Sequence, residues 1–285
     1  MNSPDKAPVK IEKHIQVESS EADAVTLLAD ASGLSKQAIK KVMASGAVWH
    51  TRGKQTHRIR CAKKALMAGD ELHLYYDEAI LAQQPAQAEL IADETSFSIW
   101  FKPRGMFSQG SKWGDHCSID RHVETRMQRP AFIVHRLDRH ASGLMIIAHS
   151  KKIAAAFAKL FRERKIDKRY EAIVSGRFPE MLTMDTPVDY KAAVSHARLL
   201  NYDSESDRSL LEINIETGRK HQIRQHLAEA GFPIIGDRLY GKADEKEGDL
   251  QLLSSALAFA SPADGEFKNY RIAPGAGLLQ QHHTP

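Results

Sequence analysis

Residues 135–144 read HRLDRHASGL and place one carboxylate, Asp138, between two arginines. The neighbouring stretches, 132–134 and 144–148, are short, apolar and rich in β-branched residues, and turn residues bound them. This pattern predicts two buried strands with Asp138 on their connection. Such connections commonly carry chemistry on a rigid support. Asp138 is therefore the candidate catalytic residue.

The two flanking arginines favour the ionised form of Asp138, because opposite charges stabilise each other at short range. An ionised carboxylate is a weak general base at neutral pH. It can still act as an anionic nucleophile, or stabilise a developing positive centre, where water is excluded. The alternative interpretation of these residues alone is an ordinary salt bridge in a turn.

The composition is that of a globular chain with room for one large and one small domain: 285 residues, 42% of them hydrophobic, with a net charge of +4. No apolar run approaches the ~18 residues of a membrane helix, and residues 1–14 are too polar for a secretory signal. We therefore expect a cytoplasmic protein with no membrane partner. Cys61 and Cys117 show no ligand spacing, so neither a disulfide framework nor a structural metal is expected.

The basic residues are concentrated in two blocks, although the net charge is small. Residues 150–171 hold eight Lys or Arg against three acids. Residues 35–64 hold no acid and nine basic residues: Lys36, Lys40, Lys41, Arg52, Lys54, Arg58, Arg60, Lys63 and Lys64. The blocks predict a surface that binds a polyanion, and ordinary solvated surface is the alternative.

The amino-terminal region is expected to contain a polar tail at 1–15, a helix over 21–31 and a second helix that Ser35 caps and Gly46 ends. Strands are expected at 47–50 and 71–76. The second helix should bury three apolar residues and expose three lysines: Ile39, Val42 and Met43 inward, Lys36, Lys40 and Lys41 outward.

Two small helices leading into a basic hairpin can lay cations along a nucleic-acid backbone. Here residues 16–81 resemble the small RNA-binding module named after a ribosomal protein of the small subunit. We expect Lys36, Lys40, Lys41 and Arg52 to contact RNA. The chain departs from the module in two respects. Arg52 stands where the module usually has Asn, and the segment 58–67 is longer than typical.

A polar, proline-containing linker is expected at 82–89, followed by a catalytic domain at 90–274 and a tail at 275–285. Strands are predicted at 98–101, 170–174 and 210–215, with helices at 152–164 and 220–229. The elements do not alternate strictly as strand, helix, strand. This favours an α+β fold with a mixed, mostly antiparallel central sheet flanked by helices, beside a small α+β amino-terminal domain.

The second basic constellation, residues 217–227, enters a helix after a turn at Gly218. We expect its first turn to carry Arg219, Lys220 and His221, which the helix dipole opposes unless an anion is near. A phosphate or the Asp138 carboxylate would supply that anion. Arg224 lies beside the apolar stripe of this helix and therefore needs a partner as well.

Over about 90–274, five segments together resemble those of the RluA-type pseudouridine synthases, both in their residues and in their order along the chain. They are Lys102-Pro103-Arg104-Gly105, His135 to Asp138 with Ser142-Gly143-Leu144, Lys168 to Ala172, Thr217 to Arg224, and Pro233 to Gly241. The resemblance implies the pseudouridine synthase fold and the isomerisation of uridine in RNA.

The resemblance also implies residue roles. Asp138 corresponds to the essential aspartate, Tyr170 to a tyrosine that stacks on the extruded uracil and assists proton removal, and Arg224 to the arginine that pairs with the aspartate. Arg136 corresponds to the residue that enters the RNA stack when the base leaves. Arg219, Lys220 and His221 are expected to contact RNA.

Two positions depart from the family pattern. Ala141 stands where Thr is usual, which removes a hydroxyl from the aspartate loop, and residues 253–256 (Leu-Ser-Ser-Ala) lack the usual His. Neither change removes a residue with an assigned chemical role.

The isomerisation needs no metal, nucleotide or flavin, and no signature of one is present, so no cofactor is expected. The expected partner is structured RNA, ribosomal first and transfer RNA second, and we expect a monomer. One alternative is a catalytically inactive RNA-binding protein of the same fold. Another is a metal hydrolase, but its four candidate ligands lack the helical spacing of common metal sites: His135, Asp138, His140 and His149.

Overall fold

The structure is a computed structural model that describes residues 8–20, 23–241, 248–273 and 278. The chain forms two compact units. The small unit comprises Met1–Pro85 and Gln109–Arg126, and the large unit comprises Ala86–Ser108 and Met127–Pro285. Within the described ranges, no helix has both the length and the apolar composition that crossing a membrane requires.

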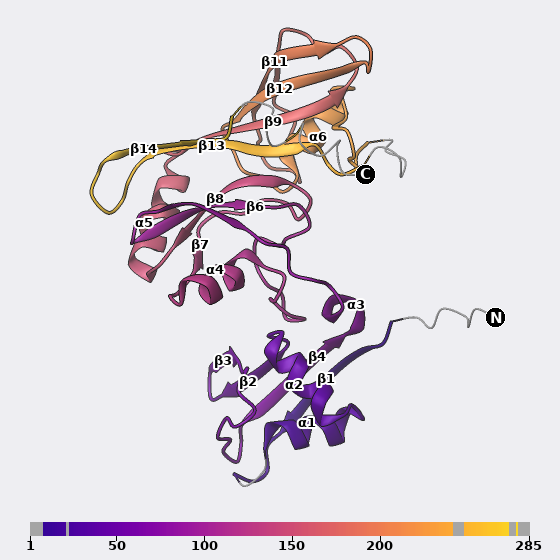
Figure 1. Cartoon of the computed structure of the whole chain (residues 1–285), viewed down its shortest axis with the longest axis vertical. Coiled ribbons are helices and arrows are strands. Elements are labelled where there is room, and N and C mark those ends of the chain that lie inside the picture. The colour runs from indigo at the N-terminus through magenta and orange to yellow at the C-terminus, as the bar shows by residue number, and fades with distance from the viewer. Residues whose placement is uncertain (1–7, 21–22, 242–247, 274–277, 279–285) are drawn as a thin grey trace, which may run out of the picture. The chain divides into compact units, whose positions relative to one another are not determined.

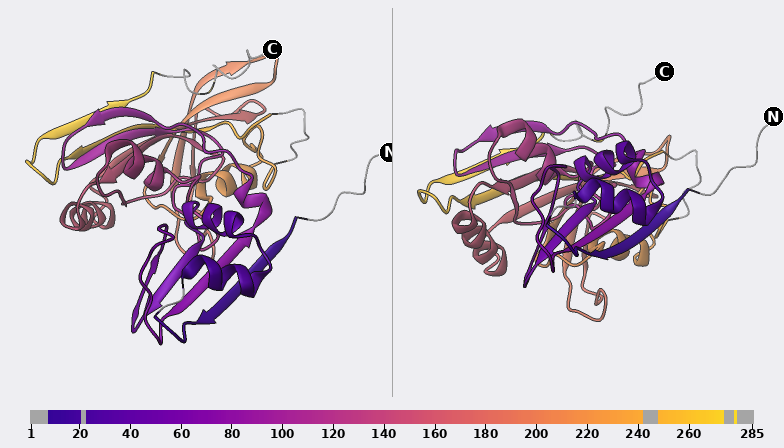
Figure 2. Two further views of the ribbon diagram at one scale, coloured as in Figure 1. Left: turned by 60° about the horizontal axis from the view of Figure 1, so that its bottom comes forward. Right: turned by 90° about the horizontal axis from the view of Figure 1, so that it is seen from below.

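The small unit is an antiparallel sheet with strand order β1-β4-β2-β3, and helices α1 and α2 cover one of its faces (Figures 1 and 2). Its elements are β1 (Lys10–Gln16), α1 (Ala24–Ser32), α2 (Lys36–Ala44), β2 (Val48–Arg52), β3 (Gln55–Arg58), β4 (Glu71–Asp77), α3 (Glu78–Leu81) and, from the later segment, α4 (Ile119–Met127).

Local sequence signals account for the helices of the small unit. Ser35 caps α2 through its side chain, which accepts a hydrogen bond from the Ala38 N–H, as the sequence predicts. The three apolar residues expected to face inward are buried in one core with Leu72 and Leu74 of β4. The first helix begins at Ala24, after the cap residue Asp23, and positions 21–22 lie outside the described residues.

The expectation of a polar tail at 1–15 is wrong for residues 10–15, which form most of β1, whereas residues 1–7 lie outside the described ranges. β1 pairs with β4 at the sheet edge, and most of its side chains are exposed. Only Ile11 and Ile15 are half-buried. An edge strand with one partly covered face carries few apolar residues, so its composition resembles that of a tail.

The expectation that 90–274 forms one continuous catalytic domain is also wrong, because residues 109–126 belong to the small unit. The Asp115 carboxylate pairs with Arg60 and lies 3.4 Å from Arg58 Nε. The Trp49 indole donates to the Lys112 carbonyl at 3.1 Å. These partners lie more than 50 positions apart in sequence, so no local pattern announces them.

The large unit contains a mixed sheet in which β10, β11, β12, β9, β13, β8, β6 and β5 lie side by side, while β14 pairs with β13 and β7 with β8 (Figure 1). Its elements are β5 (Glu89–Asp93), β6 (Phe97–Lys102), β7 (Phe132–Ile133), β8 (Ser142–Ala148), α5 (Lys151–Arg162), β9 (Asp167–Ser175), β10 (Met181–Met184), β11 (Ser195–Asp203), β12 (Arg208–Ile215), α6 (Gln222–Glu229), β13 (Leu252–Ala260) and β14 (Phe267–Arg271). The predicted fold class, a mixed and mostly antiparallel sheet with flanking helices, is confirmed.

Strand β8 positions the Asp138 loop. All seven of its residues are buried, and it pairs with β6 on one side and in parallel with β13 on the other. Gly143 permits the β13 contact, since a Cβ there would lie 2.3 Å from the Ser254 carbonyl oxygen, and its φ of +118° also favours glycine. Phe157 of α5 packs in the core with Leu144 and Ile146 of β8.

Candidate active site

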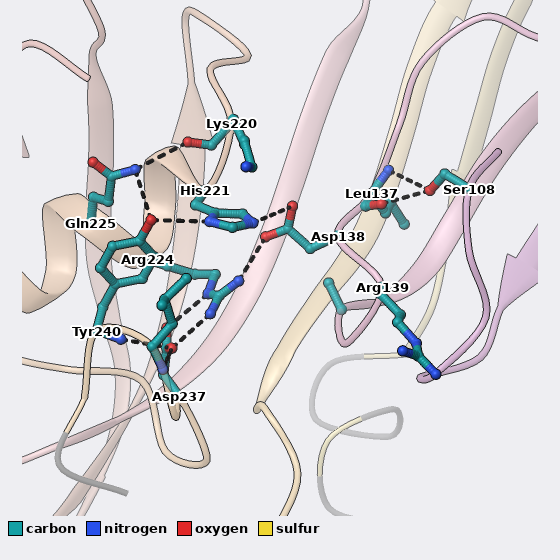
Figure 3. Close-up of polar contacts among 12 residues, drawn as sticks. Ser108, Leu137, Asp138, Arg139, Lys220, His221, Arg224, Gln225, Asp237 and Tyr240 are labelled. Atoms are coloured by element: carbon teal, nitrogen blue, oxygen red, sulfur yellow. Dashed lines mark hydrogen bonds and ion pairs between the residues drawn. The ribbon is translucent and has the colours of Figure 1, made fainter. Parts of the chain in front are cut away.

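Asp138 lies on the connection between β7 and β8, where the sequence predicts it. Ser108 fixes the residue before it: the Ser108 hydroxyl accepts from the Leu137 N–H at 2.9 Å and donates to the Leu137 carbonyl at 2.6 Å (Figure 3). The Ala141 N–H donates to the Asp138 carbonyl at 3.2 Å and closes the turn. The backbone on both sides of the carboxylate is therefore held.

Lys102, at the end of β6, supports the same loop from inside the unit. Its side chain is fully buried, and Nζ donates to the carbonyls of Pro103, Met106, Arg139 and Ala141 at 3.0, 3.0, 3.3 and 2.6 Å. Burial lowers the pKa of Lys102 to about 7, while the negative charge of Asp138 opposes this shift. The buried lysine thus supports the Asp138 loop, in which position 141 is an alanine without a hydroxyl.

The partners of the Asp138 carboxylate come from the α6 region. Arg224 Nη1 lies 3.3 Å from Oδ2, and His221 Nε2 lies 3.6 Å from Oδ1, while the Asp138 side chain keeps 22% of its surface exposed (Figure 3). Arg139 points away, donates to the Gly105 carbonyl and lies over the ring of Phe107.

Arg136 is exposed on the other side of Asp138 in sequence. The expectation that the two flanking arginines hold the carboxylate is therefore wrong, because successive side chains of the loop point in different directions. The Arg224 pairing is the one that the family resemblance implies.

Arg224 is itself anchored by Asp237, which lies in one of the family segments but has no role assigned from the sequence. Asp237 accepts from Arg224 Nε at 2.8 Å and from Nη2 at 2.7 Å. Burial raises the pKa of Asp237, but the bonds from Arg224 and from the N–H groups of Leu239 and Tyr240 outweigh it and hold the pKa below its usual range. The guanidinium therefore has a fixed orientation and presents Nη1 to Asp138.

His221 adopts a left-handed conformation with φ of +56° and stands before α6 as its cap residue. Its Nδ1 lies 3.0 Å from the Tyr240 hydroxyl, to which Gln225 also donates (Figure 3). Burial lowers the pKa of His221, and the Asp138 carboxylate opposes this shift.

The expectation that Arg219, Lys220 and His221 occupy the first turn of the helix is wrong, since α6 begins at Gln222. The Gln222 side chain accepts from the Arg219 N–H and from the Thr217 hydroxyl, and it donates to the Val194 carbonyl. Because this network holds the turn before the helix, α6 begins two residues after its predicted start at 220. Arg219 and Lys220 are exposed.

Tyr170 is buried on β9, opposite Ile213 of β12 and Ser254 of β13. Burial raises the pKa of its phenol, and the negative charge of Asp138 raises it further. The two side chains are thus close enough to interact electrostatically. At neutral pH the phenol is protonated, a state that suits a stacking surface better than a base.

The basic block of the small unit separates into two classes. Lys36, Lys40 and Lys41 are exposed on α2, as predicted. Arg52 instead binds Asp70 through Nε at 2.8 Å and Nη2 at 2.7 Å. The Arg52 side chain nevertheless stays 42% exposed, so its contact with RNA remains a prediction.

The four histidine and aspartate candidates for a metal site do not converge. Burial, and then Lys168, lowers the pKa of His135 to about 3, and its neutral ring accepts from the Ile146 N–H. His149 binds the Ser98 hydroxyl and the Pro130 carbonyl. Among the described residues, the group with metal-ligand distances is another one, in the small unit: His14, Glu71 and His73.

Comparison with known proteins finds similarity to one family. Residues 96–229 match the family model described as RNA pseudouridylate synthase. An uncharacterized RNA pseudouridine synthase of Chloroflexus aurantiacus is 38% identical over 162 residues, which are 51% of this chain and 51% of that protein. The ribosomal large subunit pseudouridine synthase D of Zymomonas mobilis is 34% identical over 147 residues, 46% of this chain and 45% of the relative. The chain spans about half the length of the first curated relatives it matches.

Two solved human structures share the fold. RNA Pseudouridylate Synthase Domain Containing 1 has a TM-score of 0.58 at 18% identity, covering 68% of this chain and 87% of that chain. Domain Containing 4 has a TM-score of 0.55 at 20% identity, covering 67% and 90%.

Proposed function

We propose that this chain is an RNA pseudouridine synthase, which isomerises uridine to pseudouridine in RNA with Asp138 as its catalytic carboxylate; its similarity to that family supports this. The observation that carries the proposal is the arrangement around that carboxylate. Arg224, fixed by the buried Asp237, presents one nitrogen to Asp138, and the Asp138 side chain is partly open to solvent.

The residues around Asp138 suit this chemistry. The reaction breaks the carbon–nitrogen glycosidic bond, turns the uracil, joins it through carbon 5 and releases the proton of that carbon. An ionised carboxylate held by a guanidinium can attack the nucleoside or stabilise positive charge as the glycosidic bond breaks. Arg224 orients this group, and Lys102 and Ser108 keep its loop in place.

Uracil must leave its stack to reach Asp138, at a cost of a few kcal/mol that stacking and phosphate contacts offset. We assign the stacking to the neutral Tyr170 phenol. The exposed Arg136, two residues before Asp138, fills the place of the extruded base. Lys36, Lys40 and Lys41 contribute phosphate contacts from the small unit.

Ribosomal RNA is the proposed substrate class, and the name of the Zymomonas relative supports it. The test is to map pseudouridines in total RNA from cells with and without the gene. Sites that disappear from ribosomal RNA support this substrate. If sites disappear from transfer RNA alone, transfer RNA is the substrate instead of ribosomal RNA.

The catalytic role of Asp138 is tested with RNA tritiated at carbon 5 of uridine, from which isomerisation releases the label. Asp138→Asn is expected to stop release while RNA affinity changes little, because the amide keeps the shape but not the charge. Asp185→Asn, an exposed position in the same unit, should retain wild-type release. Near wild-type turnover of Asp138→Asn contradicts the role, and a wild-type protein that binds RNA but releases no label is the inactive RNA-binding alternative.

A further inference from the structure

A second cationic region of the large unit lies outside the residues assigned to catalysis. It is a groove of about 1050 Å³ that the end of α5, the start of β9 and the 216–219 loop help to line. Its lining holds five cations and two carboxylates: Arg162, Arg164, Lys165, Lys168 and Arg219 against Asp167 and Glu216. Such an excess of one sign in a concave surface attracts a ligand of the opposite sign.

Lys168 is the cation whose surroundings point most directly to a ligand. The residue is half-buried, and its ammonium lies 5.7 Å from the centre of the Phe161 ring and has neither a hydrogen bond nor an ion pair with any described residue. Burial lowers its pKa. A cation withdrawn from water without a partner is unfavourable, and an anionic group of a ligand would relieve this.

The other cations differ in whether they already bind a group of the protein. Arg164 reaches Glu216 at 3.4 Å, and Arg219 Nε donates to the Ala192 carbonyl at 3.1 Å. Arg162 is exposed in the last turn of α5 and forms no ion pair within the described ranges. Lys168 and Arg162 are thus the two positions from which a phosphate can be bound without breaking an internal ion pair or hydrogen bond.

Aromatic side chains lie among these cations. Phe267 of β14 lines the groove with 73% of its surface exposed, and Phe161 of α5 lines it as a half-buried residue. A positively charged groove with exposed aromatic rings is the combination that binds single-stranded nucleic acid, since phosphates meet the cations and unpaired bases stack on the rings. A base-paired duplex offers its phosphates but not its base faces.

The groove adjoins the candidate active site. Lys168 and Tyr170 are two residues apart on β9, so their side chains leave the same face of the sheet about 7 Å apart. The 216–219 loop continues through Lys220 to His221, whose ring lies 3.6 Å from the Asp138 carboxylate.

We propose that this groove binds an unpaired RNA segment adjacent to the target uridine, with Lys168 and Arg162 at its phosphates and Phe267 against a base. The proposal rests on the RNA function proposed above and adds to it that the flanking strand is single-stranded where it lies on the enzyme.

The experiment measures the affinity of the full chain for a short fluorescein-labelled oligouridylate and for a duplex RNA of the same length over a range of salt concentrations. Lys168→Gln and Arg162→Gln should each reduce the slope of log affinity against log salt for the single strand by about 0.7. Phe267→Ser should weaken that affinity about fivefold or more without changing the slope. Lys152→Gln, the same charge change at the other end of α5 and outside the groove, should match wild type.

If Lys168→Gln and Arg162→Gln both keep the wild-type salt slope, the proposed role of the groove in RNA binding is rejected. Because Arg162 is exposed, Arg162→Gln provides this test even if Lys168→Gln misfolds. Duplex binding that equals single-strand binding and falls equally in the variants overturns the unpaired strand. Tritium release separates the two proposals. If the wild type releases no label but the variants show a reduced salt slope, the isomerase proposal is rejected and the groove proposal stands. If the wild type releases label but the variants bind as the wild type does, the groove proposal is rejected and the isomerase proposal stands.

Discussion

Arg224 reaches Asp138 from 86 positions away in the sequence, and its own orientation depends on a third residue, Asp237. One guanidinium between two carboxylates gives each acid a partner, but only Asp237 is fully enclosed, with 1% of its side chain exposed against 22% for Asp138. The buried acid therefore fixes the arginine, and the partly exposed acid is the one that we propose meets the substrate.

The buried Lys102 leads to a pH-dependent prediction. Its pKa is about 7 in the folded chain against 10.5 for an ordinary lysine, so above pH 7 the unfolded chain binds the proton more tightly. The free energy of unfolding of the wild type, relative to Lys102→Met, should therefore rise with pH between about 7 and 10.5. Urea denaturation of both proteins, followed by circular dichroism from about pH 6.5 to about pH 9.5, measures this.

A parallel pH dependence of the two proteins would show that burial does not shift this lysine. The exposed Lys152→Gln serves as the control, and its stability should follow the wild type at every pH.

At the scale of elements, the lysines and the arginines of the basic block at 35–64, on α2 and the strands after it, have different surroundings. The lysines of the block are exposed, whereas Arg52, Arg58 and Arg60 bind carboxylates of their own unit. The planar, forked guanidinium suits fixed pairs, and the flexible ammonium suits a solvated surface that meets phosphates. A count of positive charges along the sequence does not distinguish these two uses.

We predict that the triple change of Lys36, Lys40 and Lys41 to Gln weakens binding of structured RNA and lowers its salt slope by roughly 0.7 to 0.9 for each phosphate that these lysines neutralise in the wild type. The measurement is a salt titration of RNA affinity. Lys13→Gln, at an exposed position on β1, should leave the slope unchanged. An unchanged slope in the triple variant would mean that these lysines of α2 are ordinary solvated surface that does not contact RNA phosphates.

At the scale of the whole molecule, the chain leaves the large unit after Ser108, completes the small unit with residues 109–126 and returns. Asp115 joins the returning segment to Arg58 and Arg60, and its N–H donates to the Ser45 carbonyl at 2.9 Å. The small unit is therefore incomplete without a segment that lies, in sequence, between two parts of the large unit.

Asp115→Asn should consequently destabilise the small unit by about 1–3 kcal/mol, because it leaves two partly buried guanidinium groups without their anion. Hydrogen exchange read by mass spectrometry should show faster exchange in α2 and β2 and no change in β8. Glu12→Gln, which removes the exposed pair with Lys112, should leave exchange in both units unaltered. Equal acceleration in β8 would mean that the two units do not unfold separately.

The sequence by itself determined the elements around Asp138, the Ser35-capped helix and the α+β class, because alternation, helical spacing and capping act over a few neighbouring residues. It also supplied the family segments that contain Asp138, Tyr170 and Arg224. Only the tertiary structure decided that Asp237 anchors Arg224, that Lys102 lies beneath the aspartate loop and that 109–126 completes the small unit. Each of these depends on side chains that are distant in sequence and meet only after folding.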